Sequence, residues 1–291
     1  MLSLVIPKGS LEKQVLDLFS AADLTILRGG DRDYHAKIDD PRVDRVRFLR
    51  PQEIPIFVSQ GIFDLGISGR DWITETGADV VSLGEIGGGR ATDSPVHVVL
   101  AVPNAAPWQQ VEDLPEGIRI STEMPNLTAS YLAEHGVKAR VFPSAGATEA
   151  KIPDIVDAIV DLTETGSSLR KAGLRILSTL LTSRTELIAN RDAYQDRAKR
   201  AAMEDIVLLL QSALAARGQV LLKLNVAADD LPALLQVLPA LGSPTVMPLA
   251  DPAQRAVESV VPRRGINTLI PALKAAGAFD ILELPISKIV E

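Results

Sequence analysis

The chain has 291 residues, 46% of them hydrophobic and 23% charged, which argues against a disordered chain and predicts two or three folded domains. Its formal net charge of −7 at pH 7 disfavours broad binding to nucleic acids and to anionic membranes. The sequence has no cysteine and only three histidines, so disulfides and thiolate metal sites are excluded and a multi-histidine zinc site is disfavoured. The apolar runs are too short for a signal peptide or a membrane span, and we expect a cytoplasmic protein.

Short strand-like runs alternate with helical patterns in the first half of the chain, which is typical of a parallel sheet with crossover helices. The predicted strands are residues 2–7, 45–51, 63–69, 96–103, 117–123, 138–144 and 157–162. The predicted helices are residues 10–23 with Ser10 as N-cap, 51–61, 70–77 and 126–136 with Asn126 as N-cap. Residues 191–217 have the clearest helical spacing, and Gly218 suits the C-terminal cap.

The pattern changes after Gly218. Strands are predicted at 219–226, 244–249, 256–262 and 279–285, and helices at 229–241 and 265–277. The order β-α-β-β-α-β is that of a ferredoxin-like small domain, with a boundary near residues 212–219.

The stretch "DAIVDLTETGSSLRKAG", residues 157–173, combines acids with a polar loop. On a strand, Asp157 and Asp161 share one face, where carboxylates are costly to bury unless cations or hydrogen-bond donors pair with them. The loop that follows offers hydroxyls, backbone amides and one glycine at the start of a helix, which suits a phosphate. Acids for a sugar beside a loop for phosphate indicate a sugar-phosphate site; a solvated turn with edge acids is the equally weighted alternative.

Three further charged residues lie at or near the ends of predicted strands. Lys8 lies between a strand and a helix, where an ammonium suits phosphate, although an ordinary capping turn explains it as well. Arg50 ends a strand within an arginine-rich segment, residues 28–55, most of which is explained by a solvated surface with alternating charges. Asp71 begins a helix after "GISG", at the kind of sheet edge where ligands bind, although Gly66 and Gly69 are also explained by tight packing.

Together these segments resemble one family, the ATP phosphoribosyltransferases, which open histidine biosynthesis. The resemblance spans essentially the whole chain and rests on five motifs in order: "IPKGSL", "FLRPQEIPIFVSQGIFDLGISGRDW", "RISTEMPNLTASYL", "GATEAKIPDIVDAIVDLTETGSSLRKAGLRIL" and "SPTVMPLADP…VVPRRGIN". The loop 85–94 departs from the family, since Arg90 is its only cation where many relatives carry lysine.

The resemblance implies an α/β fold with a two-lobed, periplasmic-binding-protein-like catalytic part and a ferredoxin-like, ACT-like C-terminal domain. Lobe I would comprise residues 1–95 with 184–211, lobe II the PRPP-binding residues 96–183, and the regulatory domain residues 212–291. Such a chain needs no separate regulatory subunit and would form a homo-oligomer, from dimer to hexamer.

The implied reaction transfers 5-phosphoribosyl from PRPP to N1 of ATP, with release of pyrophosphate. Asp157 and Asp161 would hold the ribose hydroxyls, directly or through Mg²⁺ and its waters. Lys8 would lie near the pyrophosphate. The implied 5-phosphate loop is Thr163, Glu164, Thr165, Gly166, Ser167 and Ser168. The implied ATP-binding residues are Arg32, Arg50, Asp71 and Glu149.

The resemblance also implies feedback inhibition by L-histidine, bound where regulatory domains of neighbouring subunits meet. The matching residues are Leu241, Ser243 and Thr245, with Asp280 to pair the ammonium of the ligand.

The competing interpretation is a cytoplasmic two-lobed binding protein for a nucleotide or amino acid, with a sensory domain and no catalysis. A simple amino-acid receptor would not need the acids and phosphate loop of residues 157–168, which favours the enzyme. A nucleic-acid regulator is disfavoured by the negative charge and by the lack of a helix-turn-helix pattern.

Overall fold

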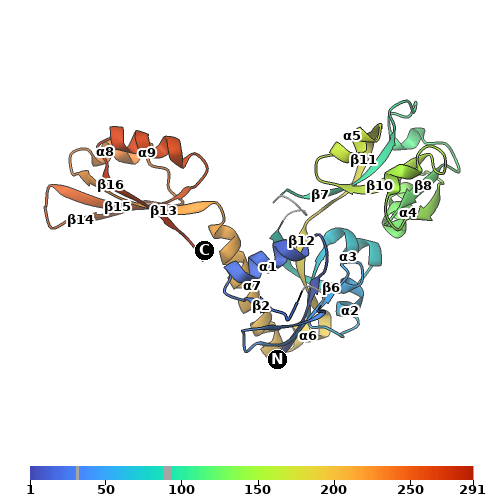
Figure 1. Ribbon diagram of the computed structural model, residues 1–291, viewed down its shortest axis with the longest axis horizontal. Helices are drawn as coiled ribbons and strands as arrows, with labels where there is room; N and C mark the ends of the chain where they lie inside the picture. Colours follow the sequence, from blue (N-terminus) through green and yellow to red (C-terminus); the bar gives the residue numbers. More distant parts are fainter. Residues whose placement is uncertain (31–32, 88–93, 291) are drawn as a thin grey trace. The chain divides into compact units, whose positions relative to one another are not determined.

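A computed structural model describes residues 1–30, 33–87 and 94–290, so the predicted residues Arg32 and Arg90 lie outside the described part of the chain. The chain divides into two compact units, Met1–Val207 and Leu208–Glu291. Within these described residues, the first unit contains two sheets and the second contains one (Figure 1).

The first sheet of unit 1 has seven strands in the order β2-β3-β4-β1-β5-β12-β6, and we call it lobe I together with its helices. Its strands are β1 (Leu2–Pro7), β2 (Ile26–Leu27), β3 (His35–Ile38), β4 (Val43–Leu49), β5 (Leu65–Gly69), β6 (Val80–Gly87) and β12 (Thr185–Asn190). The helices that follow β1, β4 and β5 are α1 (Glu12–Ala21), α2 (Ile54–Ser59) and α3 (Arg70–Thr76). Because β1 pairs in parallel with both β4 and β5, the carboxyl ends of these three strands form one edge.

Helix α2 packs closely on β5. A Cβ atom added to Gly66 would lie 2.6 Å from a methyl carbon of Val58 and 2.8 Å from one of Ile54. The glycine in the middle of this strand is therefore required by packing, and Val5 and Phe63 complete the same buried cluster.

The second sheet has five strands in the order β11-β7-β10-β8-β9, and we call it lobe II together with its helices. Its strands are β7 (Val96–Pro103), β8 (Arg119–Thr122), β9 (Arg140–Pro143), β10 (Ala158–Thr163) and β11 (Leu174–Ser183). Its helices are α4 (Pro125–Glu134) and α5 (Ser167–Lys171), with 3₁₀ turns at Val111–Asp113 and Thr148–Lys151. Strands β8, β9 and β10 are parallel, so their carboxyl ends also share one edge.

The two N-caps predicted from the sequence are wrong. Neither Ser10 nor Asn126 caps a helix with its side chain; the capping positions are Leu11 and Met124. At α4 the amide N–H groups of Asn126 and Leu127 donate instead to the carboxylate of Glu75, at 3.1 and 2.8 Å. A side chain distant in the sequence therefore does the capping that local spacing assigned to Asn126.

The long helix predicted at 191–217 is two helices, α6 (Arg191–Gln195) and α7 (Arg197–Ala216). Asp196 interrupts it, because its carboxylate accepts the amide N–H groups of Ala198 and Lys199, both at 2.9 Å. Aspartate favours such an N-cap over the helix interior. Neither α7 nor any other helix of the described residues combines the length and the apolar character needed to cross a membrane.

Unit 2 is a four-stranded sheet in the order β14-β15-β13-β16 with two helices on one face (Figure 1). Its elements are β13 (Gln219–Ala227), α8 (Leu231–Val237), β14 (Thr245–Pro248), β15 (Gln254–Pro262), α9 (Ile266–Ala275) and β16 (Phe279–Pro285). The alternation along β13 places Val220, Leu222, Leu224 and Val226 in the buried core with Leu234 and Leu273 of the helices. The predicted ferredoxin-like order is thus confirmed.

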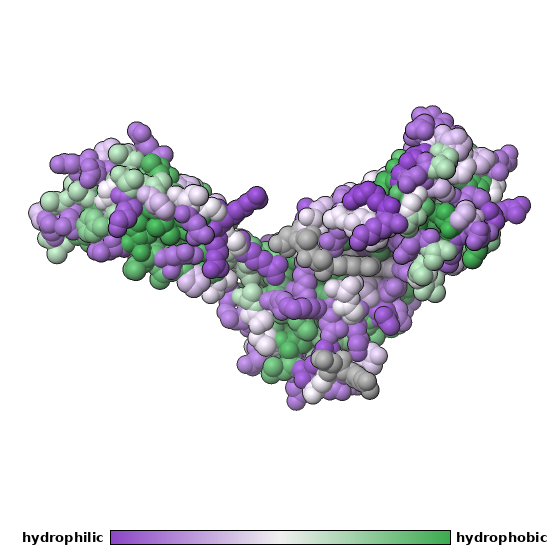
Figure 2. All heavy atoms as spheres, turned by 45° about the horizontal axis from the view of Figure 1, so that its top comes forward, coloured by the Kyte–Doolittle hydropathy of each residue, from purple (hydrophilic) through white to green (hydrophobic). Residues whose placement is uncertain are grey.

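Hydrophobic surface remains on unit 2, seen as green areas at the left of Figure 2. Exposed apolar side chains on its two edge strands include Met247 on β14 and Phe279, Leu282 and Leu284 on β16. Leu282 is 58% exposed. Such side chains at a sheet edge are typical of a surface that contacts another chain.

Candidate active site

Lobe I presents three of the predicted residues along its carboxyl edge. Lys8 follows β1, Arg50 follows β4 and Asp71 lies in the first turn of α3, directly after β5. Pro7 pairs with Leu49 across the parallel ladder, so Lys8 and Arg50 leave their strands side by side. The ammonium of Lys8 lies 4.0 Å from the ring centroid of Tyr34, and Arg50 is exposed.

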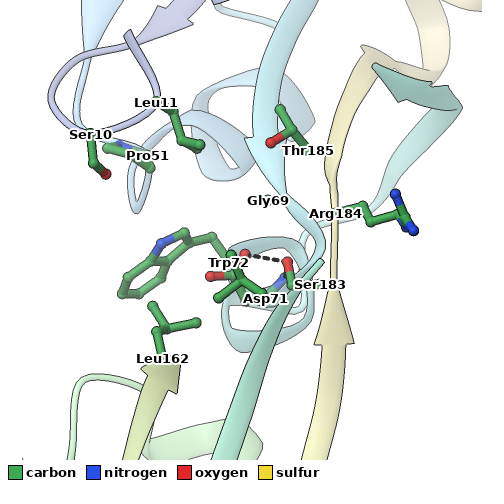
Figure 3. Close-up of a pocket in the computed structure, with 11 residues that line it drawn as sticks. Ser10, Leu11, Pro51, Gly69, Asp71, Trp72, Leu162, Ser183, Arg184 and Thr185 are labelled. Carbon is green, nitrogen blue, oxygen red and sulfur yellow. Dashed lines mark hydrogen bonds between the residues drawn. The ribbon is translucent and has the colours of Figure 1, made fainter. Parts of the chain in front are cut away.

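Asp71 is held in one orientation. It is only 6% exposed, and its carboxylate accepts a hydrogen bond from the hydroxyl of Ser183 at 2.8 Å. Its own amide N–H donates to the same hydroxyl at 3.1 Å. The backbone of Gly69 lies very close to the Asp71 side chain, since a Cβ atom at position 69 would lie 2.0 Å from a carboxylate oxygen of Asp71. Ser183, which the sequence analysis missed, ends β11 and so links lobe II to this carboxylate (Figure 3).

Lobe II presents the polar loop at the end of β10. Gly166 has a left-handed backbone with φ 69°, and α5 begins at the next residue. The hydroxyl of Thr163 accepts the Gly166 amide at 2.7 Å, which closes the turn. Thr165, Ser167 and Ser168 are exposed, so their hydroxyls can reach a ligand.

Asp161 lies at the same edge, half-buried, and one of its carboxylate oxygens accepts the Leu162 amide at 2.7 Å. It lines a small pocket with Thr122 and Glu123, the residues at the carboxyl end of β8. Glu123 was missed because its strand pattern carried no ligand signal; its place directly at a strand end could have indicated it.

Both edges contribute to one pocket (Figure 3). Lobe I supplies Ser10, Leu11, Pro51, Asp71 and Trp72, and lobe II supplies Leu162 at the end of β10. The crossover residues Ser183, Arg184 and Thr185 line it too. Its volume is about 30 Å³, room for water but not for a nucleotide, so a larger ligand would extend from it toward solvent.

Asp157 is not part of this edge. It precedes β10, at the amino end of the strand, whereas the polar loop follows the carboxyl end. Its carboxylate accepts the amide and the guanidinium of Arg119, with the shortest N–O distance 2.6 Å. Asp157 and Asp161 stand at opposite ends of β10, four residues apart at about 3.3 Å each. A joint role of the two carboxylates in binding the ribose stays a prediction.

The hydrogen bond from the Arg119 guanidinium holds the pKa of the Asp157 carboxyl below its usual range, against the opposing effect of burial. A carboxyl whose pKa is lowered by folding stabilises the protein above its ordinary pKa, and this stabilisation is lost as pH falls through the folded pKa.

We expect Asp157→Asn to lower the melting temperature near neutral pH by about 2–4 °C, because the pair with Arg119 is lost. The difference from wild type should shrink below about pH 4, where the wild-type carboxyl also takes up a proton. Thermal unfolding between acid and neutral pH tests this. The turnover of Asp157→Asn should stay close to that of the wild type. A large loss of turnover would show that Asp157 takes part in the reaction.

Glu149 lies half-buried in the 3₁₀ turn that follows β9, near the carboxyl edge of lobe II. Lys151 of the same turn was missed by sequence reasoning. Its ammonium donates to the hydroxyls of Ser121 and Ser144, at 3.1 and 2.5 Å. It therefore adds a cation to the strand ends of lobe II.

The predicted histidine-binding residues lie on two opposite edges of unit 2. Leu241, Ser243 and Thr245 are exposed at or just before β14, whereas Asp280 is on β16 and accepts the side-chain amide of Asn225 at 3.2 Å. Strands β15 and β13 stand between them, a separation of roughly 14 Å. One copy of the chain therefore does not bring these residues together.

Within the described residues, no group of three or more histidine, aspartate or glutamate side chains is arranged to hold a metal ion. Carboxylate oxygens, one or two at a time, are the ligands that Mg²⁺ usually takes from a protein. Asp161 and Glu123, which share a pocket, have the oxygen donors for this role.

The fold and site define a two-lobed α/β protein that gathers cations, carboxylates and a polar loop at the carboxyl ends of parallel strands, the arrangement of a phosphate-ligand site. Family models give the particular family. The model described as ATP phosphoribosyltransferase matches residues 50–212, and the model described as HisG, C-terminal domain matches residues 216–288. The chain belongs to the ATP phosphoribosyltransferase family.

Relatives of similar length agree with this. An ATP phosphoribosyltransferase of Pelotomaculum thermopropionicum is 44% identical over 291 residues and is matched over 99% of each chain. One of Solibacter usitatus is 46% identical over 290 residues, which cover 100% of this chain and 99% of the relative. The solved ATP phosphoribosyl transferase (HisG:HisZ) complex from Thermotoga maritima contains a chain 29% identical, with a TM-score of 0.61 over 72% of this chain and 96% of that one. The predicted fold class, family and enzyme class, a pentosyltransferase, are confirmed.

Proposed function

We propose that the two strand edges of unit 1 carry out the transfer of 5-phosphoribosyl from PRPP to N1 of ATP, the first step of L-histidine biosynthesis. The observation that carries this assignment is the pocket lined by Asp71 and Trp72 of lobe I and by Leu162 of lobe II, beside Asp161 and the phosphate loop. Because residues of both lobes line this pocket, it supports a site where a ligand bound to lobe I and a ligand bound to lobe II lie next to each other. We expect the reaction in the cytoplasm.

PRPP is assigned to lobe II. Gly166 and the hydroxyls and amides of residues 163–168 would bind the 5-phosphate, helped by the positive end of the short helix α5. Asp161 would accept hydrogen bonds from the ribose hydroxyls. Lys8, from lobe I, would neutralise charge on the pyrophosphate as it leaves.

ATP is assigned to lobe I. Arg50 has the planar, charged group that suits phosphates or a stacked base. Asp71, held by Ser183, is an acceptor with a fixed direction. Arg32 and Glu149 stay predictions as further nucleotide-binding residues.

The reaction depends mainly on the alignment of N1 of ATP with the anomeric carbon of PRPP. The lone pair of N1 forms a bond to the anomeric carbon with inversion, and the bond from that carbon to the pyrophosphate oxygen breaks, its electron pair leaving with pyrophosphate. Since N1 is already a nucleophile, no strong general base is needed. Alignment alone can supply roughly 7–11 kcal/mol in favourable systems, and cations that stabilise the leaving charge supply more.

Mg²⁺ is the proposed metal, held by Asp161, with Glu123 beside it, and by the phosphates of PRPP. When bound it supplies charge stabilisation for the pyrophosphate. The residues of the chain orient the ribose and keep the anomeric carbon facing the nucleotide.

A radiolabel assay tests the function. Purified protein is mixed with PRPP, labelled ATP, Mg²⁺ and pyrophosphatase, with and without L-histidine. A phosphoribosyl-ATP product that histidine suppresses is the expected result. If ATP binds and no product forms, the alternative of a non-catalytic two-lobed binding protein replaces the enzyme.

For the regulatory domain we propose a histidine site between copies of the chain. Ser243 and Thr245 would come from the β14 edge of one copy and Asp280 from the β16 edge of its neighbour, since one copy holds them apart. Exposed Met247 and Leu282 on these edges support assembly into a homo-oligomer, and no separate regulatory subunit is required.

We expect Ser243→Ala with Thr245→Ala to weaken histidine binding by about tenfold or more, because two hydrogen bonds are lost. Equilibrium binding of radiolabelled histidine measures this. Thr268→Ala, which removes an exposed hydroxyl on α9 of the same domain, is the control and should bind as wild type. Unchanged affinity in the double variant would remove both residues from the site.

A further inference from the structure

Helix α3 begins in lobe I and is fastened there. The amide of Arg70 donates to the carbonyl of Arg184 at 3.0 Å. The guanidinium of Arg70 donates to Glu186 of β12 at 2.5 Å, and the other carboxylate oxygen of Glu186 accepts the hydroxyl of Ser82 at 2.6 Å. Glu186 is only 2% exposed. The first turn of α3 is therefore tied to β12 of lobe I and, through Glu186, to the edge strand β6.

Two side chains further along α3, Trp72 and Glu75, contact lobe II. Trp72 is 8% exposed and belongs to the buried cluster of lobe II that contains Val98, Leu100 and Leu127. Glu75, on the same helix, is 7% exposed and accepts the amides of Asn126 and Leu127. The side-chain amide of Asn126 donates in return to the backbone carbonyl of Glu75 at 3.1 Å.

Glu75 is the cap of α4. The helix has Pro125 at its start and no capping side chain of its own at Met124, so its first amides need another acceptor. A carboxylate there satisfies two donors at once and faces the positive end of the helix dipole. An alanine at position 75 would leave those amides without this acceptor in a buried place.

Asp71 lies between these two attachments, one turn from Glu75 on the same helix. We propose that Glu75 is a positioning residue: by capping α4 it fixes α3 against lobe II and so sets Asp71 and Trp72 at the pocket shared by the lobes. The capping contact stands independently of the reaction, while its effect on transfer rests on the proposed function. Because Asp71 is assigned to the nucleotide, the effect should fall on ATP and not on PRPP.

The experiment compares Glu75→Ala and Glu75→Gln, each made in a Trp108→Phe background. The chain has two tryptophans, so Trp72 is then the only tryptophan, and excitation at its red edge, where tyrosine does not absorb, reports on it alone. In the alanine variant we expect Trp72 emission to shift to the red, the amides of Asn126 and Leu127 to exchange at least about tenfold faster, and kcat/KM for ATP to fall about tenfold with the KM for PRPP nearly unchanged. Glutamine keeps one acceptor oxygen and should recover part of each effect.

Glu134→Ala, at the exposed far end of α4, is the matched control and should match the background protein in all three measurements. Unchanged exchange and emission in Glu75→Ala would overturn the capping contact. Altered exchange with an unchanged kcat/KM for ATP would overturn the positioning role. Should Glu75→Ala fail to fold, Asn126→Ala, which removes only the return hydrogen bond, must show smaller shifts in the same directions or the proposal fails. If the parent protein transfers nothing, the proposed function falls, while exchange and emission still decide the contact.

Discussion

Asp161→Asn is expected to lower the turnover of phosphoribosyl transfer by about 10²-fold or more. The variant keeps the shape of the side chain and an oxygen that can accept the Leu162 amide, so the local backbone stays in place. It loses the charge and turns one acceptor into a donor, which opposes a ribose hydroxyl or a metal-bound water. Single-turnover transfer of label at saturating ATP and PRPP measures the chemical step.

Asp157→Asn is the comparison for this experiment, because it makes the same chemical change at the other end of β10. Asp157 is bound to Arg119 and lies away from the phosphate loop. Asp157→Asn should lower the stability of the protein and leave turnover unchanged. Asp161→Asn should lower turnover and leave the stability unchanged. Near-normal turnover in Asp161→Asn would show that this carboxylate does not bind the ribose.

Gly166→Ala should raise the KM for PRPP by about tenfold or more, through displacement of the phosphate loop. The backbone at Gly166 has φ 69°, and a Cβ atom there would meet the Arg170 guanidinium at 3.0 Å and Ile176 at 3.3 Å. The left-handed conformation alone costs roughly 1–2 kcal/mol for an ordinary residue, so the loop is driven to relax. Steady-state kinetics with PRPP varied at saturating ATP measures the change.

Gly173→Ala separates backbone strain from loss of the site. Gly173 has φ 74° and would place its Cβ in open space, with no heavy atom within 4 Å. It follows α5 and does not belong to the loop. Both alanine variants should lose stability, but only Gly166→Ala should change the KM for PRPP. An equal rise in both would show that general destabilisation, and not the phosphate loop, controls the KM.

The strand ends that build the site were predictable, because buried parallel strands are apolar runs that polar residues terminate. Lys8, Arg50 and Asp71 were placed at strand ends in this way, and their roles in the site stay predictions. Ser183 and Glu123 were not, since the hydrogen bond of Ser183 to Asp71 joins residues 112 positions apart and Glu123 shares a pocket with Asp161 only through the pairing of β8 with β10.

The wrong predictions came from rules of local spacing, applied at positions where contacts with residues distant in the sequence determine the structure. The local spacing of Asp157 and Asp161 also did not show that Arg119 pairs with Asp157 at the start of β10. Asn126 fits an N-cap by type, yet Glu75 of another helix supplies the acceptor. Arg184 is the one residue between β11 and β12, so the chain passes directly from one sheet to the other where the sequence offers no loop signal.

The return of β12 to lobe I has a consequence for synthesis of the chain. This strand, Thr185–Asn190, is fully buried and pairs with both β5 and β6, so the first sheet cannot be completed until residue 190 has left the ribosome. By then every strand of lobe II has emerged, and that lobe can fold as a unit of its own. The lobe that starts the chain is therefore the later of the two to close. Until then, the edge of β5 that faces away from β1, and the whole of β6, are the surfaces that a nascent chain must protect.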